Sequence, residues 1–372
     1  MDPQPTEVDS EVRSKFSVKD SFQLAEGEVE YKVEYRPDSR VRFEELHRSL
    51  LIKGFTPLLV GTREEAALIV RKKQAVGPSR SRVPVILGLL TLVSVLVFAI
   101  FQRESYQQFA SGFQGNVVVF TYGGAVIAVL AAHELGHRYF SKRSGTAPPT
   151  PYFIPGIPDV TSFLPALGSL SRQKEPTVNR DRLFDIMAVG PLLGFLVAVI
   201  LYAAGGFFSA PSSSPLSGCQ YVGNVEFCTI NSSILQTALD RLLGPLVPGV
   251  ASGFVRFSPL QDGASVGFLL TFFGLLPMAS FDGGHLFSLG WGVRGMRVAT
   301  YLSVFLLIVL DTPNYWALAI IVLLVAGRPA EPQLLDEVSR ISASRRWIYL
   351  GMLVLAFLCV PMPQNLAFLP LG

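Results

Sequence analysis

Apolar residues along this chain are gathered into long blocks that are bounded by short polar or basic stretches. A membrane-spanning helix needs about 20 apolar residues to cross a hydrocarbon core of about 30 Å. Five blocks are interpreted as spans on this basis: 83–101, 116 into "HELGH", 187–208, 264–291 and 347–362. Two shorter runs, 296–310 and 315–326, are separated by "DTPN" and indicate a tight hairpin. The pattern predicts an α-helical polytopic membrane protein with about seven transmembrane helices.

The first 82 positions are polar and show a different periodicity. Residues 1–28 are interpreted as a disordered acidic tail. After it, "VEYKVEYRP" alternates like a strand, "RVRFEELHRSLLIKG" has helical spacing, and "FTPLLVG" and "AALIVRKK" indicate two more strands. These elements predict a small α+β cytoplasmic domain over residues 29–75. His47 on its helix is interpreted as a surface histidine rather than a ligand.

Composition supports a membrane protein and argues against nucleic acid as a partner. Charged residues make up 16% of the 372-residue chain and hydrophobic residues 50%, whereas soluble domains are about 25% charged. A net charge of +3 is too small for a nucleic-acid-binding surface.

Basic residues set the expected orientation, because they remain on the cytoplasmic side of a membrane. They gather before the first block and after the second: Arg71, Lys72, Lys73, Arg80, Arg82, and then Arg138, Lys142, Arg143, Arg172, Lys174, Arg180 and Arg182. The segment 209–263 carries only Arg241 and Arg256. We therefore expect the N-terminus inside and an external segment at 209–263, in a prokaryotic cytoplasmic membrane.

The cysteines agree with this orientation. Cys219 and Cys228 lie in the external segment, where an oxidising compartment would allow a disulfide, and that pairing is favoured over two free thiols. Cys359 lies in the last block and is interpreted as a small apolar packing residue.

The stretch "VLAAHELGHRYF" places ionisable side chains at the end of the second block. His133 and His137 are four residues apart, so a helix puts both on one face. Glu134 follows the first histidine and completes the H-E-x-x-H pattern of zinc hydrolases, in which the glutamate is a general base. A chance match is disfavoured because ionisable groups within a spanning helix are costly unless they are paired or functional.

A catalytic zinc site needs a third protein ligand, and "LLPMASFDGGH" offers Asp282 and His285. At about 1.5 Å per helical residue, His133 lies roughly 25 Å from the outer end of its span. Asp282 lies roughly 27 Å from the outer end of its own span, counted in the same way. Because the two depths agree, Asp282 is favoured as the ligand, and His285 is expected to support it instead.

These motifs resemble the site-2 proteases, a family of intramembrane zinc metalloproteases. "PMASFDGG" matches that family's P-x-x-x-x-D-G, and "FDIMAVGPLLG" at 184–194 is similar to its glycine–proline span. The resemblance makes residues 83–362 a transmembrane metalloprotease domain. It implies one zinc ion per chain on His133, His137 and Asp282, with Glu134 as the catalytic residue.

The resemblance also implies a function, namely endopeptidase cleavage of the transmembrane segments of single-span membrane proteins within the lipid bilayer (regulated intramembrane proteolysis). One position departs from the family, because Gly274 stands where an asparagine is common. The proline- and glycine-rich stretch 146–172 is either a cytoplasmic loop or, as the resemblance favours, a membrane-dipping hairpin whose edge holds an extended substrate.

Two other classes of function remain open at this point. A proton-coupled transporter could use intramembrane histidine and aspartate residues as a proton path, although no inverted repeat of apolar segments is visible. A catalytically inactive scaffold would normally have lost Glu134 or one of the ligands, and none is lost here. The sequence leaves the substrate and the oligomeric state undetermined.

Overall fold

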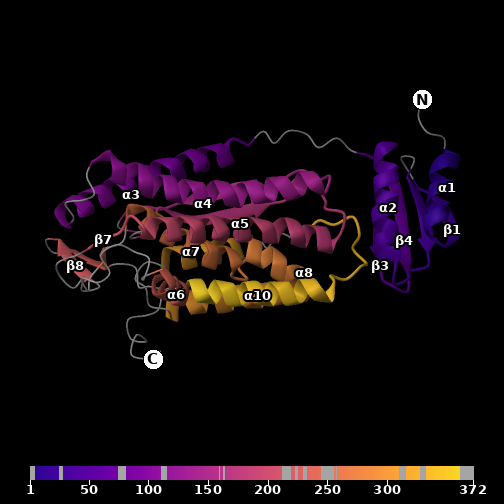
Figure 1. Ribbon diagram of the computed structural model, residues 1–372. Coiled ribbons are helices and arrows are strands. Elements are labelled where there is room, and N and C mark those ends of the chain that lie inside the picture. The colour runs from indigo at the N-terminus through magenta and orange to yellow at the C-terminus, as the bar shows by residue number, and fades with distance from the viewer. Residues whose placement is uncertain are drawn as a thin grey trace.

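The computed structural model describes residues 5–24, 28–73, 81–109, 115–158, 160–161, 164–211, 219–222, 225–228, 233–243, 255–256, 258–309, 316–326 and 332–360. Long helices lie side by side in a bundle, and a small domain formed by the N-terminal residues sits at one end of it (Figure 1). The strand β8 and the helix α6 lie at the opposite end of the bundle.

The N-terminal domain is α+β, as the sequence predicts. Its helices are α1 (Pro5–Lys15) and α2 (Ser39–Ile52), and its strands are β1 (Val18–Gln23), β2 (Val29–Val33), β3 (Phe55–Gly61) and β4 (Ala66–Lys72). The four strands form an antiparallel sheet in the order β1-β2-β4-β3. The α2 helix and strands β2, β3 and β4 confirm the elements predicted within 29–75.

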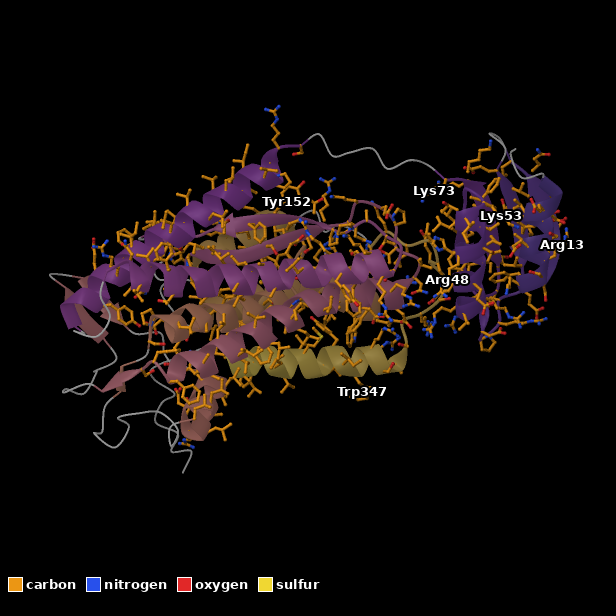
Figure 2. All side chains as sticks on the ribbon, turned by 45° about the horizontal axis from the view of Figure 1, so that its top comes forward. Arg13, Arg48, Lys53, Lys73, Tyr152 and Trp347 are labelled. Atoms are coloured by element: carbon orange, nitrogen blue, oxygen red, sulfur yellow. The ribbon has the colours of Figure 1, made fainter. Side chains whose placement is uncertain are left out.

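The interpretation of residues 1–28 as a disordered tail is wrong for most of that stretch. Residues 5–15 form α1, and residues 18–23 form β1. Val8, Val12 and Phe16 recur every four residues and are buried in the domain core, as an amphipathic helix requires. Lys53, which Figure 2 labels, also ties α2 to α1 through Glu11 at 3.1 Å.

His47 is likewise not a surface histidine. It lies on the inner face of α2 with 7% of its surface exposed. Burial lowers the pKa of His47, and the neighbouring Lys73 and Arg48 lower it further. This side chain is therefore part of the domain core and is neutral near pH 7.

The N-terminal domain is joined to the helical bundle through the edge of β3. The amide of Leu59 donates to the carbonyl of Leu335 at 2.7 Å, and the amide of Glu337 donates back to Leu59 at 2.9 Å. The segment before α10 thus extends the sheet by a short parallel bridge. Beside it, the Glu44 carboxylate accepts hydrogen bonds from Asn179 and Arg182, each at 2.8 Å.

Four of the described helices are long and apolar enough to cross a membrane: α3 (Val83–Phe109, over Val83–Glu104), α4 (Asn116–Arg143), α5 (Arg180–Gly206) and α8 (Asp282–Val309). The other helices of the bundle are shorter, namely α7 (Pro259–Leu275), α9 (Trp316–Ala326) and α10 (Ala343–Cys359). The chain is therefore a mostly helical membrane protein, and the expected number of seven spans stays a prediction.

The apolar block 264–291, expected as one span, is not one continuous helix. The chain leaves the helix after Leu275 and re-enters one at Asp282. Pro277 has no amide hydrogen and disfavours helical backbone in the residue before it, which explains why α7 ends there. The backbone of α8 is not helical at Gly292 (φ 78°), so α8 consists of two helical parts, and residues 296–309 of the run expected as a separate span lie in the second part.

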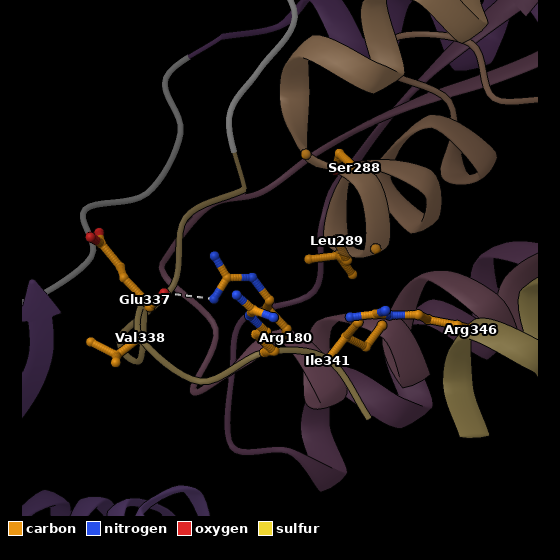
Figure 3. Close-up of a pocket in the computed structure, with 10 residues that line it drawn as sticks. Arg180, Ser288, Leu289, Glu337, Val338, Ile341 and Arg346 are labelled. Atoms are coloured by element: carbon orange, nitrogen blue, oxygen red, sulfur yellow. Dashed lines mark hydrogen bonds between the residues drawn. The ribbon is translucent and has the colours of Figure 1, made fainter. Parts of the chain in front are cut away.

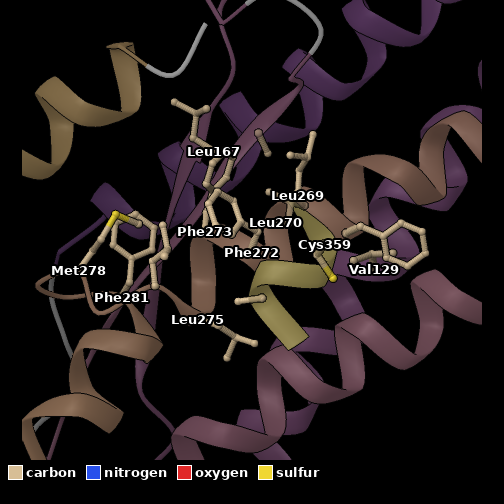
Figure 4. Close-up of a cluster of buried hydrophobic side chains, with 14 of the residues drawn as sticks. Val129, Leu167, Leu269, Leu270, Phe272, Phe273, Leu275, Met278, Phe281 and Cys359 are labelled. Atoms are coloured by element: carbon tan, nitrogen blue, oxygen red, sulfur yellow. The ribbon is translucent and has the colours of Figure 1, made fainter. Parts of the chain in front are cut away.

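The helix α7 forms the centre of the bundle. Nearly every one of its residues is buried, so its sequence is apolar on all sides. Figure 4 shows Phe272, Phe273 and Leu275 of α7 among side chains from neighbouring elements, including Val129 of α4 and Cys359 of α10. Cys359 is 1% exposed, which confirms its interpretation as a packing residue.

The segment 209–263 contains two short antiparallel pairs, β7 (Ala210–Pro211) with β10 (Val255–Arg256) and β8 (Cys219–Val222) with β9 (Val225–Cys228). Cys219 lies opposite Cys228 in the register of the second pair. Their side chains are outside the described part, so the disulfide stays a prediction. The helix α6 (Ile234–Leu243) was not expected from the sequence.

The contact between Glu44 and Arg182 yields a test of domain docking. Burial raises the pKa of Glu44, but the hydrogen bonds from Arg182 and Asn179 outweigh it and hold that pKa below the ordinary value of about 4.5. The stabilisation is therefore present above pH 4.5 and is lost as the pH falls through the lower pKa of the docked state. Glu44→Gln should speed hydrogen exchange of the Leu59 amide by about tenfold at neutral pH, because a charged hydrogen bond is lost.

Glu45→Gln is the matched control for that measurement. Glu45 adjoins Glu44 on α2 but pairs with Lys15 inside the N-terminal domain. Its substitution should leave exchange at Leu59 unchanged. Equal exchange rates in the two variants would show that Glu44 does not hold the domain in place.

Candidate metal centre

Two helices that are distant in sequence bring three potential ligand atoms together. His133 Nε2 lies 2.9 Å from Asp282 Oδ2, and His137 Nε2 lies 3.3 Å from the same oxygen. The two histidine Nε2 atoms are 3.1 Å apart. His137 and Asp282 are each 1% exposed. The structure thus brings Asp282 to the two histidines, as expected, and the group is compact enough to hold one metal ion.

Neighbouring groups aim the ligand atoms toward a common point. His137 Nδ1 lies 2.8 Å from the carbonyl oxygen of Ile186. Since a carbonyl can only accept, Nδ1 carries the proton and leaves the Nε2 lone pair free. Ser171 Oγ donates to Asp282 Oδ1 at 2.8 Å, so Oδ2 remains available. Asp282 Oδ2 and the Nε2 atoms of the two histidines therefore face one another.

His285 lies outside the three-atom group. Its Nε2 is 3.0 Å from the carbonyl oxygen of Ser171, and the Ser171 amide donates to the carbonyl of Ser280 at 3.0 Å. His285 thus anchors the strand whose hydroxyl holds Asp282. This is the supporting position that the sequence favours for His285.

The strand that carries Ser171 belongs to a β-hairpin made of β5 (Thr150–Pro155) and β6 (Ala166–Arg172), paired antiparallel. The described residues of 146–172 therefore form a hairpin, with β5 packed on α3 and β6 packed on α7. Ser94 of α3 holds it, with its hydroxyl 2.8 Å from the carbonyl oxygens of Gly156 and Pro165. Every residue of β5 is partly exposed.

Glycines on α5 allow the histidine helix to approach closely. A Cβ at Gly190 would stand 2.2 Å from His137 Nε2, and one at Gly194 would stand 3.3 Å from the Cβ of His133. On the facing helix, a Cβ at Gly136 would meet the Val189 carbonyl oxygen at 3.0 Å. Small residues at such contacts are typical of helix packing in membranes. The glycine–proline span noted in the sequence therefore shapes the metal centre.

The break before Asp282 is closed by hydrogen bonds from neighbouring helices. Tyr349 Oη of α10 donates to the carbonyl oxygens of Gly283 at 2.9 Å and Leu275 at 3.3 Å. Thr300 Oγ1 accepts from the Ala279 amide at 3.1 Å. Free backbone groups within a membrane protein need such partners. Sequence reasoning did not identify Tyr349 or Thr300, because nothing in their local pattern points to a distant break.

A cavity of about 20 Å³ adjoins the ligand atoms. That volume is enough for one water-sized species. Its walls include His133, Asp282 and Gly274, together with Phe153 and Ser169 of the hairpin. Gly274 thus lies at the site, and a Cβ there would be 4.0 Å from the His133 ring, so the position has room for a side chain.

Glu134 lies next to the three-atom group in sequence, and its Oε1 accepts a hydrogen bond from Arg138 Nε at 2.9 Å. Its side chain is 14% exposed, whereas that of Arg138 is 56% exposed. The carboxylate is therefore largely covered and stands one helical turn from its arginine partner. It is not one of the three grouped ligands.

Comparison with known proteins agrees with this geometry. The family model described as peptidase family M50 matches residues 122–310, which include both histidines and the aspartate. A "probable zinc metalloprotease EGY2, chloroplastic" of Arabidopsis thaliana is 28% identical over 251 residues, covering 64% of this chain and 42% of the relative. "Probable zinc metalloprotease EGY1, chloroplastic" of the same species is 26% identical, covering 65% and 43%. No solved structure matches the chain.

Two histidines and an aspartate meet inside a helical bundle, and a glutamate follows the first histidine in the sequence. This arrangement is typical of membrane-embedded zinc peptidases. The chain belongs to peptidase family M50. It spans less than half the length of the curated relatives it matches. Those relatives are described as chloroplastic, so they lend no support to the expected prokaryotic membrane.

The contact between Gly190 and His137 leads to a prediction about metal content. Gly190→Ala should displace the His137 ring and reduce bound metal well below one equivalent, because its Cβ would overlap the ligand nitrogen. Alanine stabilises a helix relative to glycine by about 0.5–1 kcal/mol, so loss of helix propensity cannot cause this result. Elemental analysis of purified protein gives the measurement.

The control is Gly124→Ala on α4, where a Cβ would meet nothing within 4 Å. This variant should keep the metal content of the native chain. Full metal occupancy in Gly190→Ala would contradict the close approach of α5 to His137.

Proposed function

We propose that the chain is an intramembrane zinc-dependent endopeptidase that cleaves the transmembrane segments of single-span membrane proteins. The observation that carries this proposal is the convergence of His133, His137 and Asp282 inside a bundle of apolar helices. Family membership and the names of the relatives support the same class of activity. The cleavage of membrane-spanning substrates goes beyond those names.

The donor set fits zinc. Two imidazole nitrogens and one carboxylate oxygen form a three-ligand site of the kind that leaves a fourth position open for catalysis. His133, His137 and Asp282 would hold the ion, one per chain, with Ser171 and the Ile186 carbonyl orienting two of the ligands. When bound, zinc acts as a Lewis acid toward a peptide carbonyl and makes water more acidic.

Glu134 is the proposed general base. Its position after His133 puts its carboxylate on the same helix as the two histidines, and the hydrogen bond from Arg138 Nε holds that carboxylate in place. In the proposed reaction Glu134 takes a proton from the attacking water and passes it to the leaving amine nitrogen. No other described acid adjoins the ligands in sequence on this helix.

The hairpin supplies a proposed place for the substrate. A peptide bond in a helix is shielded, so the substrate must unwind locally and its free backbone groups need new partners. The partly exposed strand β5 could offer them by strand addition. Phe153 of β5 and Ser169 of β6 also line the cavity beside His133 and Asp282, which supports delivery of an extended segment to the metal centre.

Orientation belongs to the same proposal. The N-terminal domain lies at one end of the bundle, and the described elements β7, β8 and α6 of the segment 209–263 lie at the other (Figure 1). The basic residues gather at the end that carries the N-terminal domain, which supports a cytoplasmic N-terminus and an external 209–263 segment. The metal centre would then lie nearer the cytoplasmic side, with α3, α4, α5, α7, α8, α9 and α10 as the seven proposed spans.

The assigned role of Glu134 can be tested with one substitution. Glu134→Gln keeps the size of the side chain but cannot accept a proton. Cleavage of a co-expressed single-span substrate should fall about a hundredfold to ten-thousandfold, on the order of 3 to 5 kcal/mol of barrier. Zinc content and substrate binding should persist.

Asp282→Ala provides the contrasting variant, because it should lose both zinc and cleavage. Substrates with a glycine or proline near the cytoplasmic end of their span should be cut faster by the native chain, since less helix must be unwound. Undiminished cleavage by Glu134→Gln would rule out its role as the base.

Orientation can be tested by labelling single cysteines in a chain whose native cysteines are replaced. A membrane-impermeant reagent should reach Ser213→Cys in intact cells or vesicles with native orientation. It should reach Lys174→Cys, an exposed residue between β6 and α5, only after permeabilisation. Labelling in the opposite order would reverse the proposed topology without affecting the chemistry.

A further inference from the structure

A second and larger cavity lies away from the metal centre, at the junction of the bundle with the N-terminal domain. Its volume is about 490 Å³, within the range of small-molecule sites. Its walls come from the start of α5, the middle of α8, the start of α10 and the segment before α10: Arg180, Ser288, Leu289, Gly290, Gly292, Glu337, Val338, Arg340, Ile341 and Arg346.

Three arginines line this one cavity, and within the described part of the chain none of them forms an ion pair with a carboxylate. Arg180 Nη1 donates to the backbone carbonyls of Glu337 at 2.7 Å and Ser339 at 2.8 Å. Within the described part of the chain, Arg340 and Arg346 make no side-chain hydrogen bond or ion pair. The Nε of Arg346 is buried without a partner, an arrangement that costs free energy unless a ligand accepts its hydrogen.

Figure 3 shows how these side chains lie. Arg180 and Arg346 reach from separate helices toward the same space, whereas the carboxylate of Glu337 points away from Arg180. Asp336 is buried nearby, but its Oδ1 accepts from the amides of Val338 and Ser339 and it does not line the cavity. Three arginines and one glutamate line the cavity, so its lining carries an excess of positive charge, which the nearby carboxylate of Asp336 reduces.

Exposed tryptophans flank the cavity. Trp291 lies between the wall residues Gly290 and Gly292, and Trp347 follows Arg346. They are 43% and 72% exposed, and Figure 2 shows Trp347 directed away from α10. Tryptophan is enriched at the level of lipid headgroups. The two tryptophans therefore favour a position of the cavity near the level of the lipid headgroups.

We propose that this cavity binds a phosphate group, carried by an anionic membrane lipid or by a small soluble phosphate compound. Guanidinium groups match phosphate oxygens in paired hydrogen bonds, and one phosphate has enough oxygens to bond all three arginines. The wall formed by α8 includes Gly292, where the backbone is not helical (φ 78°) and α8 is kinked. The bound anion links α5, α8 and α10 to the segment that holds the N-terminal domain.

The test is thermal unfolding of the purified full chain in a neutral detergent. Phosphatidylglycerol, compared with phosphatidylcholine, should raise Tm, since a ligand that binds only the folded chain stabilises it. Sodium phosphate, compared with sodium chloride at equal ionic strength, is the soluble probe. In Arg340→Gln, Arg346→Gln and the double variant, the apparent affinity should fall about tenfold to a hundredfold, because charge-assisted bonds are lost.

Arg294→Gln is the matched control. Arg294 is exposed on α8 two residues beyond Gly292 but does not line the cavity, so it measures general attraction to charged headgroups. The rise in Tm of Arg294→Gln with either probe should equal that of the native chain. A response to phosphatidylglycerol alone identifies a lipid, and a response to phosphate alone identifies a soluble compound. No response to either probe, or an equal response in the double variant, would overturn the proposal.

Discussion

The broken helix between Leu275 and Asp282 is the constraint on which the rest of the bundle depends. Ending α7 inside an apolar bundle exposes backbone carbonyls and amides that lipid cannot satisfy. Tyr349 and Thr300 satisfy several of them, and the hairpin strand β6 accommodates others through Ser171. The break places the carboxylate of Asp282 at the first position of a new helix, where it faces two histidines. The helices α7, α8 and α10 and the β5–β6 hairpin are thus arranged around this one break in the helix.

The junction with the N-terminal domain extends this arrangement outward. The sheet of that domain gains its parallel bridge at Leu59 from the segment that leads into α10, and α10 carries Tyr349. Arg40 and Arg345 both pair with Asp181 at the start of α5, the helix whose glycines pack on His133 and His137. The small domain is therefore fastened to the same elements that shape the metal centre, and it is not an independent appendage.

Much of this organisation could be predicted from the sequence, and the failures have identifiable physical causes. The ligand group could be predicted because the spacing of His133 and His137 along α4, and the place of Asp282 within its apolar block, are visible in the sequence. The break in the helix within 264–291 was not predicted, because hydropathy does not register a proline that interrupts an apolar run. Residues 1–28 were wrongly interpreted as disordered because their acidic residues obscured the helical spacing of Val8 and Val12. These two residues are buried only because later parts of the chain complete the domain core. Tyr349 and the arginine-lined cavity depend on tertiary packing, which no local pattern records.

The separation of the ligands along the chain has a consequence for biosynthesis. His133 and Asp282 are 149 positions apart, so a ribosome adding about 5–20 residues per second needs roughly 7–30 s to pass from one to the other. Throughout that interval the histidines stand in the nascent bundle without their carboxylate. Tyr349, which closes the break beside Asp282, emerges later still. The complete ligand set is therefore a late product of translation, and the newly made protein spends its first moments as a bundle that cannot yet hold its ion in place.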